Sequence, residues 1–226
     1  ASLKAMLKTL KSQVIDVPMT IGGKKIMGAG KIAIHPPHEL KHTLGYHGKA
    51  DAGMVKQAID AALEAKKSWE NMAWQDRAAI FLKAADLLAG PFRAKMNAAT
   101  MLAQSKNAFQ AEIDCVAELC DFWRFNVQFM IDIYNQQPES PAGTWNRMEY
   151  RALEGFVFAL TPFNFTSIAG NLPGAPALMG NTVVWKPADS QIYSAAVIME
   201  ILEAAGLPPG VVNLVFVDGK TAGEVI

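Results

Sequence analysis

The chain has 226 residues, 51% of them hydrophobic, and its 21 basic and 21 acidic side chains give a formal net charge of zero. This composition excludes an intrinsically disordered chain, which combines low hydrophobicity with high net charge. The lack of a basic excess argues against a nucleic-acid partner. No window approaches the roughly 18 apolar residues of a membrane span, and residues 1–14 lack the apolar core of a secretory signal.

The first part of the chain predicts short strands followed by a loop. Residues 17–34 are rich in glycine and β-branched side chains and contain a Gly-Gly turn, as in a hairpin. A Pro-Pro pair then ends this pattern, because proline extends neither element. Four histidines within thirteen residues make a zinc-binding module one alternative. The proline pair interrupts their spacing and no cysteine lies nearby, so we predict a surface loop and no metal site at His35, His38, His42 and His47.

Helical periodicity dominates the next part of the chain. Apolar side chains recur at helical spacing at 54–69, 76–89, 91–105 and 108–134. Asp76 is the expected cap of the second helix, which the Gly-Pro pair at 90–91 ends. Cys115 and Cys120 lie on different faces of the last stretch, so no disulfide is expected between them. Both are predicted to be buried and reduced.

The last part of the chain alternates strands and helices. A boundary rich in proline and glycine at 138–143 precedes a strand-like alternation at 144–151. A continuous apolar run at 155–160 is typical of a buried parallel strand. The pattern then predicts a helix at 166–180, a strand at 182–185, a helix at 190–205 and a strand at 211–217. Such alternation predicts βαβ crossovers and a parallel sheet.

Three unusual segments follow these strands. They are Thr161-Pro-Phe-Asn-Phe-Thr, Lys186-Pro-Ala-Asp and Asp218-Gly-Lys-Thr-Ala-Gly. An open parallel sheet binds its ligand at the carboxyl ends of its strands, so these segments are the candidate site. The usual Gly-x-Gly-x-x-Gly dinucleotide fingerprint is absent after the first strand.

Longer motifs around these segments resemble a known family. Pro162-Phe-Asn-Phe, Leu178-Met-Gly-Asn-Thr-Val-Val-Trp-Lys-Pro-Ala-Asp and Gly206-Leu-Pro-Pro-Gly-Val-Val-Asn-Leu-Val resemble the aldehyde dehydrogenase family, in its order and spacing. Gln110-Ala-Glu-Ile-Asp and Tyr150-Arg-Ala-Leu-Glu-Gly-Phe-Val resemble its 1-pyrroline-5-carboxylate branch. That branch oxidises glutamate γ-semialdehyde to glutamate in proline breakdown, with NAD. The resemblance covers the whole chain but less than half of a family member.

The resemblance implies an α/β fold with a helical N-terminal region and the first strands of a doubly wound parallel NAD-binding sheet. Residues 1–138 would be strands and helices that pack on the cofactor domain, and residues 153–226 the start of that domain. Residues 139–152 would be one strand of an oligomerisation hairpin, which implies a homodimer or larger assembly. Bacterial cytoplasm and mitochondrial matrix both suit reduced cysteines.

The resemblance also assigns roles to single residues. Asn164 would donate a hydrogen bond to the oxyanion of the reacting aldehyde; the alternative is that Asn164 only shapes a turn. Lys186 would hold the ribose hydroxyls of NAD. Asp189 matches a position where relatives carry glutamate, and capping of the next helix is its alternative. The positions implied to line the cofactor are Leu160, Thr161, Pro162, Phe163, Lys186, Ala188, Asp189 and Gly219.

Two further residues resemble the substrate pocket of the narrower branch. Phe165 would pack on the aliphatic part of the semialdehyde, with plain core packing as its alternative. Glu118 would be a partly buried carboxylate in the pocket, which requires a partner; a solvated helix face is its alternative.

The family's nucleophilic cysteine and general-base glutamate lie on later segments. Cys115 and Cys120 do not match the nucleophile motif, so this piece should be inactive alone. An aldehyde dehydrogenase with another substrate, or a non-catalytic assembly module of the same fold, are the alternatives in function.

Overall fold

The computed structural model describes residues 2–226, and its central element is a five-stranded sheet of order β3-β2-β8-β7-β6. Strands β6 (Val157–Leu160), β7 (Val183–Lys186) and β8 (Val212–Leu214) run parallel, as their apolar runs predicted. This confirms the α/β fold and the parallel sheet. Strand β7 is fully buried except at its end, because helices cover both faces of the sheet.

The first hairpin extends this sheet rather than packing on it. Strand β2 (Met19–Ile21) pairs antiparallel with β8 through Thr20 and Leu214, and β3 (Lys24–Ile26) forms the edge. Gly22 and Gly23 make the turn with φ of 57° and 78°, which favours glycine at both positions. Strands β2 and β3 therefore belong to the same sheet as β6, β7 and β8.

A second, smaller sheet lies beside the first, with strand order β1-β5-β4. It contains β1 (Ile15–Asp16), β4 (Ala29–Ile34) and β5 (Gly45–Lys49). Between β4 and β5, residues 35–44 form the loop that the Pro-Pro pair predicted.

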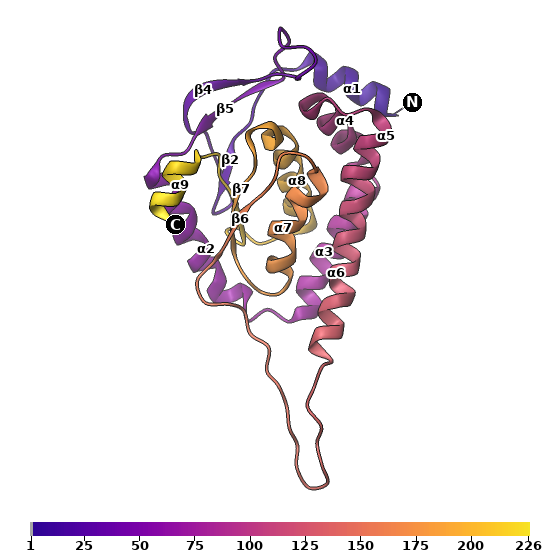
Figure 1. The fold of residues 1–226 in the computed structure, drawn as a ribbon, viewed down its shortest axis with the longest axis vertical. Coiled ribbons are helices and arrows are strands. Elements are labelled where there is room, and N and C mark those ends of the chain that lie inside the picture. Colours follow the sequence, from indigo (N-terminus) through magenta and orange to yellow (C-terminus); the bar gives the residue numbers. More distant parts are fainter. Residues whose placement is uncertain (1) are drawn as a thin grey trace.

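Helices form layers on either side of the large sheet (Figure 1). On one face lie α2 (Ala52–Trp69) and α9 (Gly219–Val225). On the other lie α7 (Thr166–Leu178) and α8 (Ile192–Ala205), the crossovers of the βαβ units. An outer layer packs on these two and consists of α3 (Trp74–Ala89), α4 (Arg93–Gln104), α6 (Glu118–Tyr134) and, against α4, α1 (Ser2–Ser12).

The core lies between these layers. Its largest fully buried side chains include Trp69, Trp123 and Trp185. The indole of Trp69 donates to Ala177 O at 2.9 Å, which ties α2 to the end of α7. Within residues 2–226, no helix has the length and apolar character needed to cross a membrane.

Two helical predictions need correction. Asp76 does not cap α3: the helix begins at Trp74, with Ala73 in the cap position, and Asp76 lies in the first turn. There its charge still favours the helix N-terminus. The predicted long helix at 108–134 is divided into α5 (Ala108–Ala111), the π-helix η1 (Glu112–Ala117) and α6. π-Helical turns are rare and often mark functional sites.

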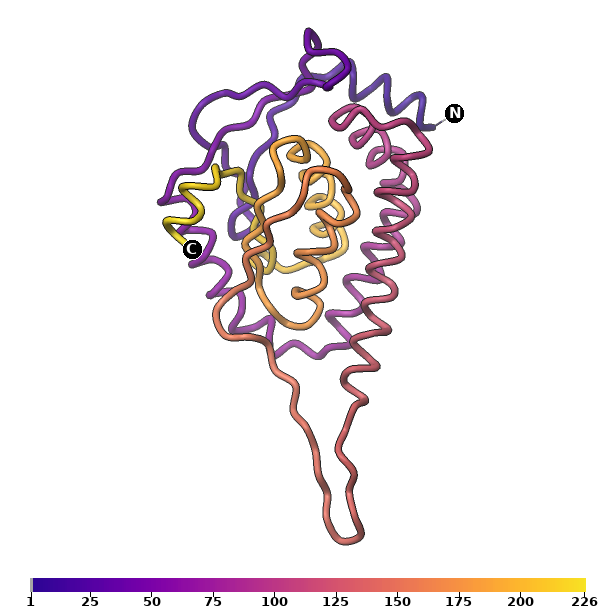
Figure 2. Tube along the Cα trace, in the orientation of Figure 1, coloured from indigo at the N-terminus to yellow at the C-terminus, as the bar shows by residue number. Residues whose placement is uncertain are grey.

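Residues 135–156, called the arm from here on, project from the body as two extended segments, its legs, that run side by side and meet at a turn (Figure 2). The predicted strand at 144–151 is wrong, because no residue of the arm is helix or strand. Side chains rather than a backbone ladder join the two legs. The amide of Met148 donates to Gln137 Oε1 at 2.8 Å, and Asn146 Nδ2 donates to Glu139 O at 2.8 Å.

Candidate functional site

The candidate segments meet at the carboxyl ends of β6 and β7. Leu160 pairs with Lys186 in the parallel register, so the segments after these residues begin side by side. Thr161 continues the pairing, since its amide donates to Lys186 O at 3.1 Å. Its hydroxyl accepts from Trp185 Nε1 at 3.0 Å, and Thr161 is buried. Thr161 therefore joins the end of β6 to β7 beside the candidate site.

Apolar side chains project from the same edge. Leu160 is 60% exposed and Phe163 is 71% exposed, while Pro162 between them is half-buried. Both side chains lie at or just beyond the end of a partly buried strand, separated by two residues in the sequence. The edge therefore offers an apolar surface for a ligand.

The end of β7 offers a cation to the same edge. Lys186 is half-buried, and its ammonium makes one hydrogen bond within the described residues, a long one of 3.5 Å to Pro187 O. Ala188 is half-buried and Asp189 is exposed. The capping alternative for Asp189 is wrong, because Ala188 and Gln191 occupy the cap positions of the short 3-10 helix η2 (Asp189–Gln191) and of α8.

The segment after β8 begins helix α9. Asp218 caps this helix, accepting from the amide and the hydroxyl of Thr221 at 2.9 Å each. These hydrogen bonds lower the pKa of Asp218. Gly219 is exposed, and a Cβ added there would meet nothing within 4 Å. The backbone at Gly219 is therefore open to a neighbouring ligand.

Asn164 lies in the loop between β6 and α7. The residue is exposed, and within residues 2–226 its side chain makes no hydrogen bond. Ser105 is the only non-glycine residue with a positive φ in this range, so Asn164 has an ordinary backbone conformation. An asparagine that shapes a turn typically has a left-handed backbone or a side-chain hydrogen bond to nearby backbone. Asn164 has neither, so its amide is available to a ligand.

A lysine that the sequence did not single out holds this loop. Lys106 Nζ donates to Asn164 O and lies 4.8 Å from the centre of the Phe165 ring. The same ammonium lies 2.9 Å from Asp114 Oδ2, on η1. Phe165 is half-buried under this cation, so it is not simply a core residue. No local sequence signal marks Lys106, because its partners lie on other elements.

Glu118 faces the first turn of α7 from α6. Its carboxylate accepts a hydrogen bond from Ser167 Oγ in the first turn of α7, and Ser167 is fully buried. Glu118 itself is half-buried. The solvated-face alternative is therefore wrong, and Ser167 is the partner that a half-buried carboxylate requires.

Neither cysteine is suited to nucleophilic attack. Burial raises the pKa of Cys115 to about 12 and the pKa of Cys120 to about 11. Both thiols are unpaired and buried, as predicted. Because the thiolate is the reactive form, neither residue serves as a nucleophile at neutral pH.

The surface-loop prediction is wrong for His47, which lies buried in β5 where this strand pairs with β4. The other histidines make separate contacts. His35 Nδ1 lies 2.7 Å from His42 O, and His38 Nδ1 lies 2.8 Å from Ser105 Oγ. Across the described range, no group of three His, Cys, Asp or Glu side chains is placed to hold a metal ion. The zinc-binding alternative has no support from this arrangement.

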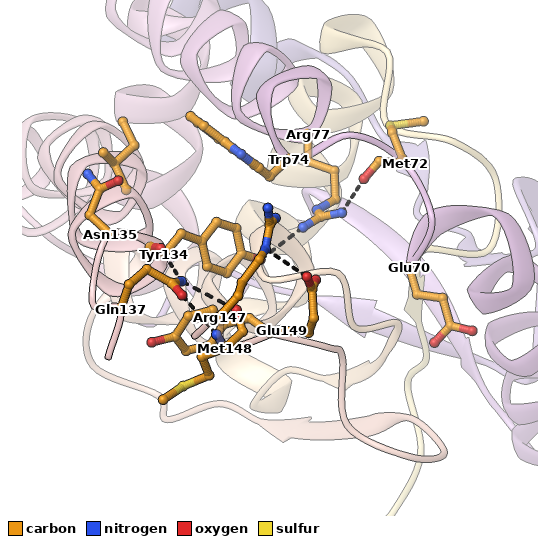
Figure 3. Close-up of a pocket in the computed structure, with 12 residues that line it drawn as sticks. Glu70, Met72, Trp74, Arg77, Tyr134, Asn135, Gln137, Arg147, Met148 and Glu149 are labelled. Carbon is orange, nitrogen blue, oxygen red and sulfur yellow. Dashed lines mark hydrogen bonds and ion pairs between the residues drawn. The ribbon is translucent and has the colours of Figure 1, made fainter. Parts of the chain in front are cut away.

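A cavity of ≈ 320 Å³ lies at the base of the arm (Figure 3). It is distinct from the strand-end site, since the arm leads into the amino end of β6. Its arginines already have partners: Arg147 Nε lies 2.7 Å from Glu149 Oε1, and Arg77 donates to the neutral oxygens Leu178 O, Met72 O and Tyr134 Oη. This cavity contains none of the residues predicted for the site.

The chain is similar to known proteins over nearly its whole length. A sequence profile described as the aldehyde dehydrogenase family matches residues 26–226. Delta-1-pyrroline-5-carboxylate dehydrogenase of Agaricus bisporus is 51% identical over 219 residues, which cover 95% of this chain and 40% of that protein. The mitochondrial enzyme of the same name from Mus musculus is 44% identical, over 100% of this chain and 40% of its own length.

Solved structures of proteins with this name are also similar to the chain. The Delta-pyrroline-5-carboxylate dehydrogenase of Mycobacterium tuberculosis superposes with a TM-score of 0.97 and 55% identity, over 99% of this chain and 42% of that chain. One structure of that protein is bound with NAD. A Thermus thermophilus 1-pyrroline-5-carboxylate dehydrogenase mutant gives a TM-score of 0.87 at 27% identity. The chain thus spans about 40% of the length of the curated relatives it matches.

Proposed function

Because the chain belongs to the aldehyde dehydrogenase family, we propose that it is part of an enzyme that oxidises L-glutamate γ-semialdehyde to glutamate with NAD. The observation that carries this proposal is the 55% identity and the TM-score of 0.97 to the Mycobacterium tuberculosis enzyme, over 99% of the chain. The match includes the segments at the carboxyl ends of β6, β7 and β8. Proline breakdown is the process in which this reaction would take part.

Asn164 is the proposed oxyanion donor. Its amide, which has no partner within the described residues, would donate to the aldehyde oxygen as negative charge develops there. A donor held in place before the reaction contributes more than one that must reorganise during it. The attacking thiolate and the general base would come from the remainder of the full-length protein, since Cys115 and Cys120 are buried and protonated.

The residues at the strand ends suit NAD. Lys186 would donate to the ribose hydroxyls, because its ammonium has only a long contact at 3.5 Å. The apolar surfaces of Leu160 and Phe163 and the open backbone of Gly219 would pack on the cofactor, with Thr161, Pro162 and Ala188 beneath. When bound, NAD supplies the acceptor for the two electrons removed from the substrate. Asp189 would repel a 2′-phosphate, which favours NAD over NADP.

Glu118 and Phe165 form the proposed wall of the substrate pocket. The Phe165 ring would cover the methylene groups of the semialdehyde. The carboxylate of Glu118, held by Ser167, would take part in the polar side of the pocket. An aldehyde dehydrogenase with another substrate would differ in this wall and in walls supplied by the rest of the protein.

The arm supports a proposal about assembly. Residues 139–152 project from the body and carry the exposed side chains of Trp145 and Met148. These features suit an oligomerisation element of a homodimer or larger assembly. The relatives from Emericella nidulans and Mus musculus are named as mitochondrial, so mitochondrial matrix and bacterial cytoplasm are the proposed compartments.

The substrate proposal is tested with the full-length protein. NADH formation is measured with glutamate semialdehyde and with propionaldehyde at equal concentrations. We expect a clearly higher kcat/KM for the semialdehyde. Equal or reversed preference would refute the substrate, and no NADH with either aldehyde would favour a non-catalytic assembly module. Lys186→Met should raise the dissociation constant for NAD, whereas Lys67→Met, at an exposed lysine of α2 that pairs with Glu64, should not.

A further inference from the structure

The position of Lys106 is fixed by an unusual backbone. Ser105 precedes it, ends α4 and adopts a left-handed conformation with φ of 57°. A non-glycine residue rarely adopts this conformation. The Ser105 hydroxyl is in turn held by His38, whose amide donates to it at 3.1 Å and whose Nδ1 lies 2.8 Å away. The chain reversal that presents Lys106 is therefore supported by a second segment.

The ammonium of Lys106 is fully engaged. It has three N–H donors. One faces Asp114 Oδ2 at 2.9 Å, one donates to Asn164 O, and the ring centre of Phe165 lies 4.8 Å away. The side chains of Lys106 and Asp114 are only 15% and 23% exposed. Such an ion pair is screened less by solvent than a surface pair, so it holds a defined geometry.

The residue after Phe165 is anchored by a different set of contacts. The Thr166 hydroxyl accepts from Gln104 Nε2 at 2.7 Å and lies 3.2 Å from Thr100 Oγ1. Thr166 is completely buried. The backbone of Asn164 and Phe165 thus lies between two fixed points, Lys106 on one side and the buried Thr166 cluster on the other.

We propose that Lys106 is a positioning residue for the reaction, and this rests on the proposed function. By holding the Asn164 carbonyl and covering Phe165, its ammonium keeps the Asn164 amide directed to the aldehyde oxygen and the ring against the substrate chain. The carboxylate of Asp114 neutralises the charge of the ammonium and holds it beside the loop. Lys106 acts through Asn164 and does not itself touch the reacting atoms.

The test is a double-mutant cycle in the full-length enzyme, with Lys106→Met and Asn164→Ala alone and combined. We expect Lys106→Met to lower kcat about 10-fold, less than the roughly 100-fold cost of misplacing a reacting group by about 1 Å. The dissociation constant for NAD should not change. Lys106→Arg, which keeps the charge, should restore most of kcat. In the Asn164→Ala background, Lys106→Met should have no further effect, because coupled residues are not additive.

Lys95→Met is the matched control. Lys95 also forms a partly buried ion pair, with Glu200, and its side chain is 31% exposed, but it contacts neither Asn164 nor Phe165. This control should leave kcat unchanged. If Lys106→Met does not fold, Asp114→Asn replaces it, with a smaller loss of kcat that also disappears in the Asn164→Ala background.

Two results would overturn the positioning role. One is a kcat of Lys106→Met equal to that of the wild type. The other is a loss that persists undiminished in the Asn164→Ala background, which a purely structural ion pair would give. Failure of the wild-type enzyme to oxidise the semialdehyde would instead refute the proposed function, and the two failures are therefore distinguishable.

Discussion

Arg77 is predicted to stabilise the junction of three elements. It lies in α3 and is only 4% exposed. Its Nε donates to Leu178 O at 3.0 Å at the end of α7, its Nη2 donates to Tyr134 Oη at 3.1 Å at the end of α6, and its Nη1 donates to Met72 O. A cation at the C-terminus of α7 also favours the helix dipole.

Arg77→Met would leave three hydrogen-bond acceptors without their donor, which lowers the free energy of unfolding. The carbonyl of Leu178, a residue only 2% exposed, would lose its partner, at a cost of ~2 kcal/mol in the free energy of unfolding. Met72 and Tyr134 are half-buried and can bind water, so each adds ~0.5 kcal/mol. The total is about 3 kcal/mol. The melting temperature shifts less in a longer chain, so the full-length protein, about 2.5 times the length of this chain, should lose roughly 2–3 °C.

Thermal unfolding of the full-length protein measures this effect, with Arg124→Met as the control. Arg124 pairs with Asp86 at 2.9 Å, but the two side chains are 47% and 75% exposed. Loss of such a surface pair should change stability by less than about 1 kcal/mol. Equal melting temperatures for Arg77→Met and Arg124→Met would refute the reasoning.

Three more predictions concern buried groups. Gly174→Ala would place a Cβ 2.9 Å from Trp123 Nε1. The overlap should cost ~1–3 kcal/mol, which offsets or exceeds the helix-propensity gain of about 1 kcal/mol. In urea unfolding, Gly174→Ala should therefore be less stable than Gly223→Ala, whose Cβ meets nothing within 4 Å. Burial lowers the pKa of His47 from 6.5, so only the unfolded state binds a proton as the pH falls below about 6.5. The free energy of unfolding should therefore decrease as the pH falls below about 6.5. His47→Leu should lose this pH dependence, and unfolding curves of the variant that keep it would contradict the prediction. Cys115 and Cys120, with pKa values of about 12 and about 11, should stay unmodified by iodoacetamide at pH 8, and a labelled peptide from either in the folded enzyme would disprove their burial.

The local pattern of the sequence was sufficient for the elements that are periodic and buried. The apolar run before Leu160 and the alternation of strands with helices predicted β6, β7 and β8 and their parallel order. Pairing between distant segments gave no such signal. Thr20 pairs with Leu214 at the edge of β8, and only the tertiary fold brings these residues together.

Two misassignments have local causes. Alternation at 144–151 predicted a strand, but side chains such as Gln137 and Ser140 bond the backbone of the opposite leg in place of a ladder. Asp76 resembled a helix cap, yet the helix starts two residues earlier, where the Asp76 amide donates to Ala73 O at 3.0 Å. A polar residue in the first turn and a polar cap look alike in a sequence.

The candidate site was predictable only in part. Family motifs indicated Asn164 and Lys186, because both lie within a few residues of a strand end. Lys106 and Ser167 gave no signal, since each acts through a residue far away in the sequence: Lys106 through Asn164, and Ser167 through Glu118. Such partners are set by how α4, η1, α6 and α7 pack together.

The most direct test of the central claim is the kcat of Asn164→Ala in the full-length enzyme with glutamate semialdehyde and NAD. Loss of the proposed oxyanion donor should lower kcat by about 100- to 1,000-fold, with the dissociation constant for NAD unchanged. Asn71→Ala, which removes an exposed asparagine that donates to Lys67 O at 2.9 Å, should retain full activity. An Asn164→Ala enzyme with wild-type kcat would contradict the assignment of this strand-end loop as the reaction site.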